Sequence, residues 1–327
     1  MSKISVVSGI YPNLAFGFLF LRKQINNHYM TLSNMRRLDP TGKSPGDMHQ
    51  LLVGTVAPRP IAFVSTLDAG GNANLAPYSF FNVVSTQPAM LAFAPVLRGN
   101  DGTAKDTLQN LRETKEAVIN VVTEPIVRQM AITSIQYPPE VDEFTKSGLT
   151  PLPSELVKPA RVKESPVHFE CTLHDIISFG DHGGAGQLVI CRVRLIHLAD
   201  YIFDAKDRID PHKIDLMGRM GRAFYTRASG EAIHRIYQAS NKLSIGYEAL
   251  PETIRHSTVL TGNELGQLAG LHERPSFQKL DELRKKIGEP SPKGETLHLR
   301  IREALSNGDM ELAGKLAFLE TSETEGT

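Results

Sequence analysis

The sequence contains no tryptophan, only two cysteines and no excess of charge of either sign. Cys171 and Cys191 are too few for a disulfide-stabilised secreted scaffold, so we expect both to be buried apolar residues of a cytoplasmic protein. Because 36 Lys and Arg balance 36 Asp and Glu, no overall positive field attracts nucleic acid or an anionic membrane. The composition therefore favours a small ligand over a polyanionic partner.

Acidic residues are also absent from the first 38 positions, which carry five basic ones. The apolar run of this segment, residues 14–21, is too short to span a bilayer. An acid-free segment with Arg and Ser is typical of organellar transit peptides, and a short apolar run is a feature of secretory signals. No small-residue cleavage site follows the apolar run, and no regular amphipathic pattern is visible. We therefore favour a disordered extension, or an upstream extension of a reading frame whose true start is Met30 or Met35.

Turn signals between short apolar runs predict an antiparallel β protein. The segment Asp68-Ala69-Gly70-Gly71-Asn72 is a strong hairpin signal after an alternating strand. A glycine-rich loop, residues 180–186, separates two long strands in the same way. Hairpin connections favour an antiparallel, Greek-key-like barrel over a parallel sheet. The expected strands are 61–67, 73–84 in broken form, 90–94, 117–123, 166–179 and 187–198.

Helices are expected between the strands and in the last third of the chain. Asp106, followed three residues later by Gln109, matches a capping box and predicts a helix over 107–115. Near Ser229 the composition changes to helical spacing. We therefore divide the chain into an extension (1–37), a barrel domain (38–228) and a helical appendage (229–327). The other expected helices are about 125–135, a short one at 143–148, and 264–271, 277–287, 297–305 and 310–319.

Three polar clusters are the most informative part of the sequence. They are PRPIAFVST (58–66), NLAPYSFF (74–81) and KDTLQN (105–110). A ligand with an anionic tail and a flat apolar ring needs donors and a cation at one end, and backbone groups and aromatics at the other. The clusters together provide both kinds of group.

The third cluster has the chemistry of a phosphate site. Lys105, Asp106 and Thr107 occur where a loop enters a predicted helix, whose N-terminus offers unpaired N–H groups and a partial positive charge. Taken singly, a solvated lysine and a capping aspartate are the commoner interpretations, but the clusters lie close together in sequence. Further donors to a phosphate or ring carbonyl are expected from Arg59, Ser65 and Thr66.

The second cluster fits the edge of a planar ring. Pro77 removes a backbone donor, so residues 74–77 must bulge or lie at a sheet edge, where N–H and C=O groups stay free. Asn74 and Ser79 would assist these backbone groups in hydrogen bonding to the ring. Aromatic side chains beside them either stack on the ring or belong to the core, and both interpretations stay open. These aromatics are Tyr78, Phe80 and Phe81.

Together these motifs resemble the flavin reductase-like family, which includes flavoredoxin and has an FMN-binding split-barrel fold. The resemblance covers roughly residues 38–225, and PETIR and LTGNELG in the helical extension are similar to a bacterial subset of that family. Several motifs in the same order make the match specific. The motifs are PRPIAFVST, NLAPYSFF, KDTLQN, INVV, DEFTKSGLTP, PVHFEC and GGAGQLVICRV.

The resemblance implies a homodimer that binds FMN, with FAD as a possible substitute, at or near the subunit interface. Position alone suggests the loop residues Asp181, His182 and Gly183 for a nicotinamide site. With the residue chemistry above, the expected flavin contacts are Arg59, Ser65, Thr66, Asn74, Leu75, Ala76, Pro77, Ser79, Phe80, Lys105, Asp106 and Thr107.

The function implied is that of an NAD(P)H-dependent flavin oxidoreductase, in which hydride passes from nicotinamide to flavin when the two rings stack. One alternative is a non-catalytic FMN electron carrier that serves a protein partner, and a weaker one is an oxidase like the pyridoxamine phosphate oxidases. NADH or NADPH is the expected donor, and a partner monooxygenase is a possible acceptor.

Other ligand motifs are incomplete. No GxGxxG fingerprint occurs, so a pyridine nucleotide is expected to bind transiently beside the flavin and not on a Rossmann domain. His168, Cys171 and His174 have ligand-like spacing, but residues three apart on a strand point to opposite faces. We therefore predict no metal site.

Overall fold

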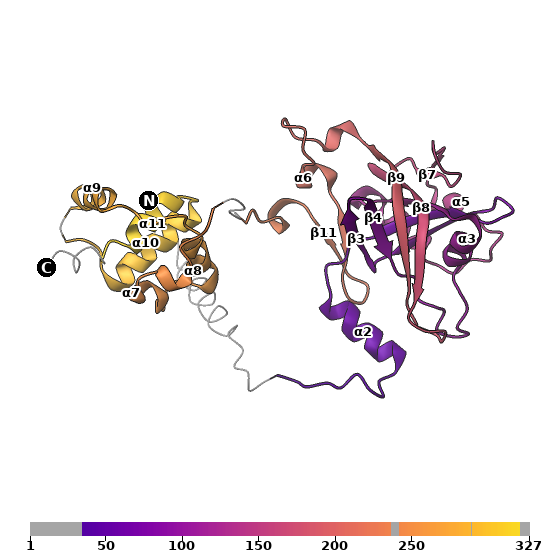
Figure 1. Ribbon diagram of the computed structural model, residues 1–327, viewed down its shortest axis with the longest axis horizontal. Coiled ribbons are helices and arrows are strands. Elements are labelled where there is room, and N and C mark those ends of the chain that lie inside the picture. The colour runs from indigo at the N-terminus through magenta and orange to yellow at the C-terminus, as the bar shows by residue number, and fades with distance from the viewer. Residues whose placement is uncertain (1–34, 237–241, 289, 321–327) are drawn as a thin grey trace, which may run out of the picture. The chain divides into compact units, whose positions relative to one another are not determined.

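Seven antiparallel strands form one sheet, in the order β2-β1-β5-β8-β9-β4-β3. Figure 1 labels β3, β4, β8 and β9 of this sheet. This computed structural model describes residues 35–236, 242–288 and 290–320, so the expected extension up to residue 34 lies outside the described residues. The hairpins of the sequence prediction are present, and the antiparallel fold is confirmed. The strands are β1 (Ala62–Leu67), β2 (Ala73–Tyr78), β3 (Phe81–Thr86), β4 (Ala89–Phe93), β5 (Glu116–Asn120), β8 (Val167–Ser178) and β9 (Gln187–Leu198).

The predicted second strand is in fact two strands at opposite edges of the sheet. β2 pairs with β1, whereas β3 pairs with β4. Only Ser79 and Phe80 separate them, and three Cα steps span at most about 11 Å. The two edges must therefore approach each other, which curls the sheet into a barrel that stays split between β2 and β3.

Side chains of β1 divide the core into two clusters because successive residues face opposite sides of a strand. Ala62 and Val64 pack with Leu108 and Leu111 of helix α3. Ile61 and Phe63 pack instead among residues that include Met130 and Phe144, from helices α4 and α5. The sheet is thus covered on both sides, and α3 and α5 lie on opposite faces of β1.

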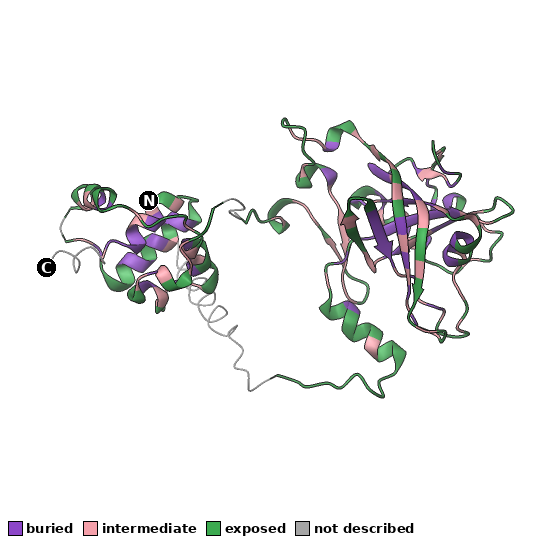
Figure 2. Cartoon of the chain, viewed as in Figure 1, coloured by how far each residue is buried: buried purple, intermediate pink, exposed green. Residues whose placement is uncertain are grey.

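The helices of this unit include one that sequence reasoning missed, α2, which begins at the N-cap Ser44. Most of α2 is exposed (Figure 2). Pro125 does lie at a helix start, but the expected helix over 125–135 is shorter, a 3₁₀ turn followed by α4. Two short strand pairs were also missed, β6 (Pro151–Leu152) with β7 (Arg161–Val162) and β10 (Met217–Arg219) with β11 (Tyr225–Arg227). The helices are α2 (Pro45–Thr55), α3 (Asp106–Thr114), α4 (Val127–Ile132), α5 (Glu143–Ser147) and α6 (Pro211–Ile214).

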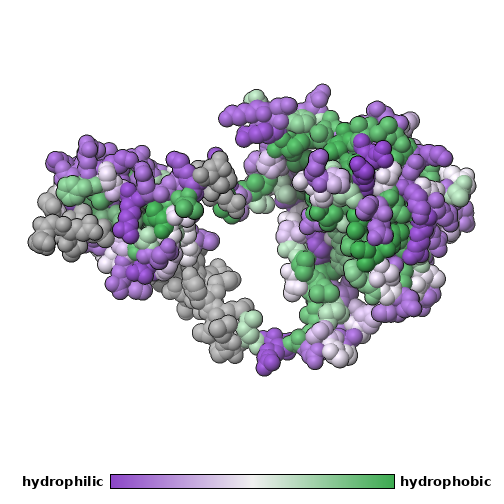
Figure 3. All heavy atoms as spheres, in the orientation of Figure 1, coloured by the Kyte–Doolittle hydropathy of each residue, from purple (hydrophilic) through white to green (hydrophobic). Residues whose placement is uncertain are grey.

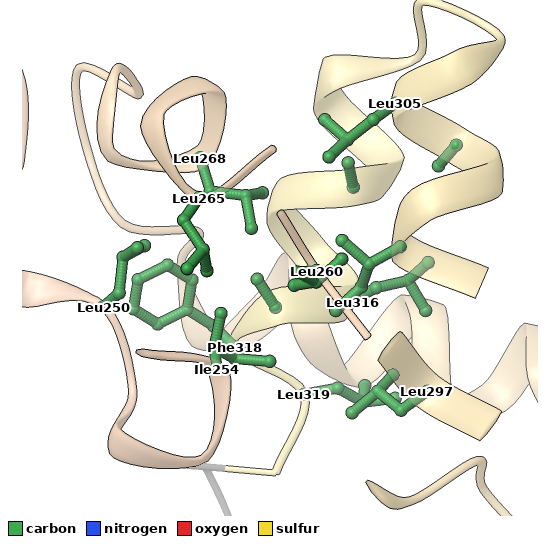
Figure 4. Packing of buried hydrophobic residues seen from close by; sticks show 14 of the residues in the cluster. Leu250, Ile254, Leu260, Leu265, Leu268, Leu297, Leu305, Leu316, Phe318 and Leu319 are labelled. Atoms are coloured by element: carbon green, nitrogen blue, oxygen red, sulfur yellow. The ribbon is translucent and has the colours of Figure 1, made fainter. Parts of the chain in front are cut away.

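The chain divides into two compact units between Ile233 and His234. The second unit is helical and has its own apolar core, in which Leu297 and Ile301 of α10 are fully buried (Figure 4). α8 begins with a true capping box between Thr261 and Glu264. No helix among the described residues is long and apolar enough to cross a membrane. The helices of this unit are α7 (Glu252–Arg255), α8 (Gly262–Ala269), α9 (Phe277–Ile287), α10 (Gly294–Ser306) and α11 (Met310–Ala317).

The buried carboxylate of Glu170 binds a loop to strand β8. Glu170 of β8 is fully buried and accepts hydrogen bonds from the backbone N–H groups of Glu155 and Leu156 at 2.8 and 2.6 Å. His197 of β9 donates a third bond at 2.7 Å through Nε2. Burial raises the pKa of Glu170, but the three donors outweigh it, so the net pKa lies below its ordinary value.

We expect Glu170→Gln to lower the free energy of unfolding by about 2–4 kcal/mol, because an amide N–H would face backbone donors. Since the folded-state pKa is depressed, the stabilisation is present above the unfolded pKa and is lost as pH falls through the folded value. The free energy of unfolding should therefore depend less on pH in the acidic range for the variant than for the wild-type chain. Urea unfolding of the intact chain, followed by β-sheet circular dichroism between about pH 3 and 7, measures both effects.

Glu155→Gln is the matched control, because the Glu155 carboxylate is exposed and lies 3.7 Å from the same histidine. Its removal should change stability by less than about 0.5 kcal/mol. Equal stability of Glu170→Gln and the wild-type chain would contradict this role for Glu170.

Candidate functional site

A pocket runs along the outer edge of β2 toward the start of α3. Asn74, Ala76, Pro77 and Tyr78 form its β2 side. The opposite sides come from the loop before α3, the segment after α4 and the first residue of α5. These remaining lining residues are Arg98, Lys105, Asp106, Thr133, Ser134, Ile135, Gln136, Tyr137 and Glu143. Asn74 of the second predicted cluster and Lys105 and Asp106 of the third thus line the same pocket.

The first turn of α3 leaves donors free at this pocket. Within the described chain, the backbone N–H groups of Asp106 and Thr107 have no hydrogen-bond acceptor, whereas those of Leu108 and Gln109 bond to the Lys105 carbonyl. The Lys105 ammonium makes no ion pair with described residues and lies 5.4 Å from the centre of the Tyr78 ring. Free N–H groups beside a cation at a helix N-terminus are the arrangement that binds phosphate.

The expected capping box at Asp106 is wrong. Lys105 is the N-cap residue, and no side chain caps this helix. The Asp106 carboxylate instead pairs with Arg98 at 3.2 Å, because the preceding loop folds back on the helix start. Arg98 also donates to the hydroxyl of Thr103 and the carbonyl of Ala104.

Burial lowers the pKa of Lys105, and the nearby charge of Arg98 lowers it further, while Asp106 acts in the opposite direction. The ammonium is therefore a cation that the protein alone stabilises poorly. A ligand anion beside it would restore the missing interaction.

The glycine-rich loop between β8 and β9 packs against the Arg98 loop. A Cβ at Gly183 would lie 2.9 Å from the carbonyl oxygens of Arg98 and Gly99, so only glycine fits at this contact. Asp181 and His182 of the same loop extend into solvent. The structure thus gives Gly183 a packing role, and a nicotinamide site in this loop stays a prediction.

Asn74 connects β1, β2 and α3 through one amide group. Its Nδ2 donates to Thr107 Oγ1 at 2.7 Å and to Thr66 Oγ1 at 3.3 Å. Asn110 donates to the same Thr66 oxygen at 3.1 Å. Thr66 and Thr107 are fully buried behind Asn74, so in this arrangement they position the site and do not line it.

The outer edge of β2 carries few free donors. Its pairing with β1 is continuous from Ala73 to Tyr78, so the segment with Pro77 lies at an edge, as predicted, and does not bulge. Leu75 N–H donates to Glu143 Oε2 at 3.0 Å, and Pro77, two residues on, has no N–H. The edge therefore offers mainly carbonyl oxygens to a ligand, while the Leu75 side chain lies in the core.

Other predicted contacts lie away from the pocket. Ser65 faces the opposite side of β1 from Thr66, and its hydroxyl is buried without a hydrogen-bond partner in the described chain. The Arg59 guanidinium binds the C-terminal end of α2, where it donates to the carbonyls of Val53 and Val56 at 2.6 and 2.7 Å. Ser79 accepts a bond from Arg59 Nε, and Phe80 lies 6.0 Å from the same guanidinium. Contacts of Arg59, Ser65, Ser79 and Phe80 with a flavin stay predictions.

Sequence reasoning missed Arg98, Glu143 and the segment 133–137 as parts of the pocket. Arg98 stands in a loop that no motif includes. Glu143 belongs to the DEFTKSGLTP motif, but there it was interpreted only as a helix start. No group of three or more His, Cys, Asp or Glu side chains in the described ranges is placed to hold a metal ion.

Comparison with known proteins agrees with this geometry. Residues 54–207 match the model of the flavin reductase like domain. An uncharacterized protein of Aquifex aeolicus is 40% identical over 190 residues, which are 58% of this chain and 94% of the relative. The chain belongs to the flavin reductase-like family.

Two solved structures define the fold of this flavin reductase-like domain. Nitrilotriacetate monooxygenase component B from Bacillus cereus is 31% identical, has a TM-score of 0.57, and the match covers 63% of this chain and 98% of that one. A split-barrel protein of Shewanella frigidimarina is 21% identical with a TM-score of 0.54, over 63% of this chain and 100% of that one. The β unit is accordingly a split barrel.

The residues of this flavin reductase-like pocket fit a phosphorylated flavin. Free helix donors and Lys105 suit the phosphate, and β2 offers an edge beside the Tyr78 ring. The Tyr78 hydroxyl is buried and makes no hydrogen bond of normal geometry with the described residues, although Thr107 lies next to it. Burial also raises the pKa of this hydroxyl, so it stays neutral at physiological pH.

Proposed function

We propose that the protein is an FMN-binding oxidoreductase that uses NADH or NADPH to reduce flavin. The single observation that carries the proposal is the start of α3, where Lys105 and Asp106 line a pocket along the β2 edge. In the described chain the Lys105 ammonium has no ion pair and the Asp106 N–H has no acceptor. When bound, a flavin supplies a ring that accepts hydride from a reduced pyridine nucleotide. Lys105 and the N–H group of Asp106 would hold its phosphate.

The protein's part in this reaction is to bind and orient. The Asn74 amide fixes the distance between β2 and α3, and the Arg98–Asp106 pair fixes the loop before the helix. Because component B of nitrilotriacetate monooxygenase is similar to this chain, a partner monooxygenase is a suitable acceptor for the reduced flavin.

Absorbance spectra of the purified protein with FMN, recorded without oxygen, test the function. Addition of NADH or NADPH should bleach the oxidised flavin band within seconds with one donor and more slowly with the other. A protein that binds FMN but stays oxidised with both donors would be an electron carrier. Failure to bind either FMN or FAD would exclude the cofactor itself.

We expect Lys105→Ala to weaken FMN binding by roughly tenfold to a hundredfold, which corresponds to one lost charge-assisted hydrogen bond. Riboflavin, which lacks the phosphate, should bind the variant and the wild-type chain equally. Fluorescence titration of both flavins measures the effect. Lys163→Ala, an exposed lysine of the same unit, is the control and should leave both affinities unchanged. An unchanged FMN affinity in Lys105→Ala would rule out the phosphate role.

We also propose that the split barrel forms a homodimer. β3 is an edge strand, and its consecutive residues Val83 and Val84 are 59% and 55% exposed. Ile177 and Phe179 at the end of β8 are exposed as well, and Figure 3 shows apolar surface on this unit. An edge strand with apolar side chains on both faces favours association with another chain.

Light scattering should give a mass of twice 36.0 kDa for the wild-type chain. Val83→Lys should shift the mass toward that of one chain, because a buried charge opposes association. Leu156→Lys, at an exposed apolar residue of another loop, is the control and should stay dimeric. A wild-type protein with the mass of one chain at micromolar concentration would contradict the dimer.

A further inference from the structure

Glu143 is the one acidic side chain of the pocket whose partner is a backbone N–H. It is 7% exposed, and its Oε2 accepts the bond from Leu75. Its other oxygen, Oε1, accepts no hydrogen bond from the described part of the chain and is not among the buried atoms sealed from solvent. A nine-tenths buried carboxylate that lines the pocket thus keeps one oxygen for which the described residues supply no hydrogen bond of normal geometry.

The surroundings of Glu143 place it near the α3 end of the pocket. Glu143, Asn74 and Asp106 line both this pocket and a second, polar one beside α3. Arg98 neutralises Asp106, but no cation pairs with Glu143 in the described residues. A carboxylate can only accept hydrogen bonds, so this position suits a donor and repels a phosphate.

Burial raises the pKa of Glu143, the Leu75 N–H lowers it, and the charges of Asp106 and Asp142 raise it again. The group therefore gains from any further donor that reaches it while it is ionised. A ligand hydroxyl provides such a donor without adding charge.

We propose that Glu143 is a positioning residue that accepts a hydrogen bond from a hydroxyl of the polyol chain joining the phosphate to the ring of the bound flavin. The inference rests on the proposed function, because it requires a flavin in this pocket. It follows from the residues that line one pocket, which include the start of α3, the buried Glu143 carboxylate and the β2 edge. The ribityl chain occupies the matching place in the ligand.

The test compares riboflavin with lumiflavin, which has the same ring and a methyl group in place of the ribityl chain. At about pH 8, well above the ordinary pKa of a glutamate, fluorescence titration gives both affinities for the wild-type chain, Glu143→Gln and Glu113→Gln. Gln keeps an oxygen for the Leu75 N–H. Glu113 is an exposed carboxylate of α3 that lines only the second pocket, so it controls for loss of one charge.

We expect the wild-type chain to prefer riboflavin over lumiflavin, and Glu143→Gln to reduce this preference by about tenfold or more, with lumiflavin affinity unchanged. Glu113→Gln should retain the full preference. If Glu143→Gln lowers the affinities for riboflavin and lumiflavin equally, Glu143 has only a structural role, through its bond to Leu75. That result would overturn the inference.

Two further outcomes separate the inference from the proposed function. If the wild-type chain binds both ligands with less than about a tenfold difference, the positioning role is wrong even if Glu143→Gln does not fold. If the wild-type chain binds neither these ligands nor FMN, the proposed function fails, and the inference fails with it.

Discussion

The short connection between β2 and β3 constrains the whole β unit. Ser79 and Phe80 must carry the chain from one edge of a seven-stranded sheet to the other, so the sheet has to curl until its edges nearly meet. Pro77 also has no N–H to donate on the edge of β2 that does not pair with β1. The same constraint that shapes the barrel therefore leaves an edge strand open to other elements.

What covers that edge determines the chemistry of the pocket. α3 approaches β2 through the Asn74 amide, and α5 approaches it through the Glu143 carboxylate. Each contact satisfies a polar group that would otherwise be unpaired on an edge strand. The pocket lies between the two contacts, so the residues that complete the sheet edge also form the pocket walls.

Local patterns in the sequence were enough to predict hairpins and helices. The turn at Asp68–Asn72, the two long strands and the bounds of α9 follow from signals within a few residues of each element. The strand order could not be predicted in this way, because it depends on closure between segments that carry no mutual signal. The two halves of the predicted second strand are nearly continuous in sequence but pair with different neighbours.

The capping-box prediction failed because a loop residue competes with the local partner, whereas the predicted flavin contacts stay predictions. Asp106 fits a capping box, yet Arg98 pairs with it after the loop folds back. Ser65 and Thr66 are neighbours in sequence, but strand alternation sends their hydroxyls to opposite faces. Lys105, Asn74 and Pro77 do line one pocket, and the helix end and strand edge that hold them are features which local sequence does indicate. Their contacts with a flavin stay predictions.

The charges of the pocket would favour one direction for a ligand with a single anionic end. Arg98 and Asp106 pair with each other, which leaves Lys105 without an ion pair and one oxygen of Glu143 without a donor in the described residues. A partly desolvated cation and a partly desolvated anion that do not neutralise each other both gain from ligand groups of complementary character. A phosphate at Lys105 followed by a hydroxyl-bearing chain at Glu143 would satisfy both at once. The protein's own charge pattern would therefore favour the ligand orientation in which the phosphate faces the start of α3.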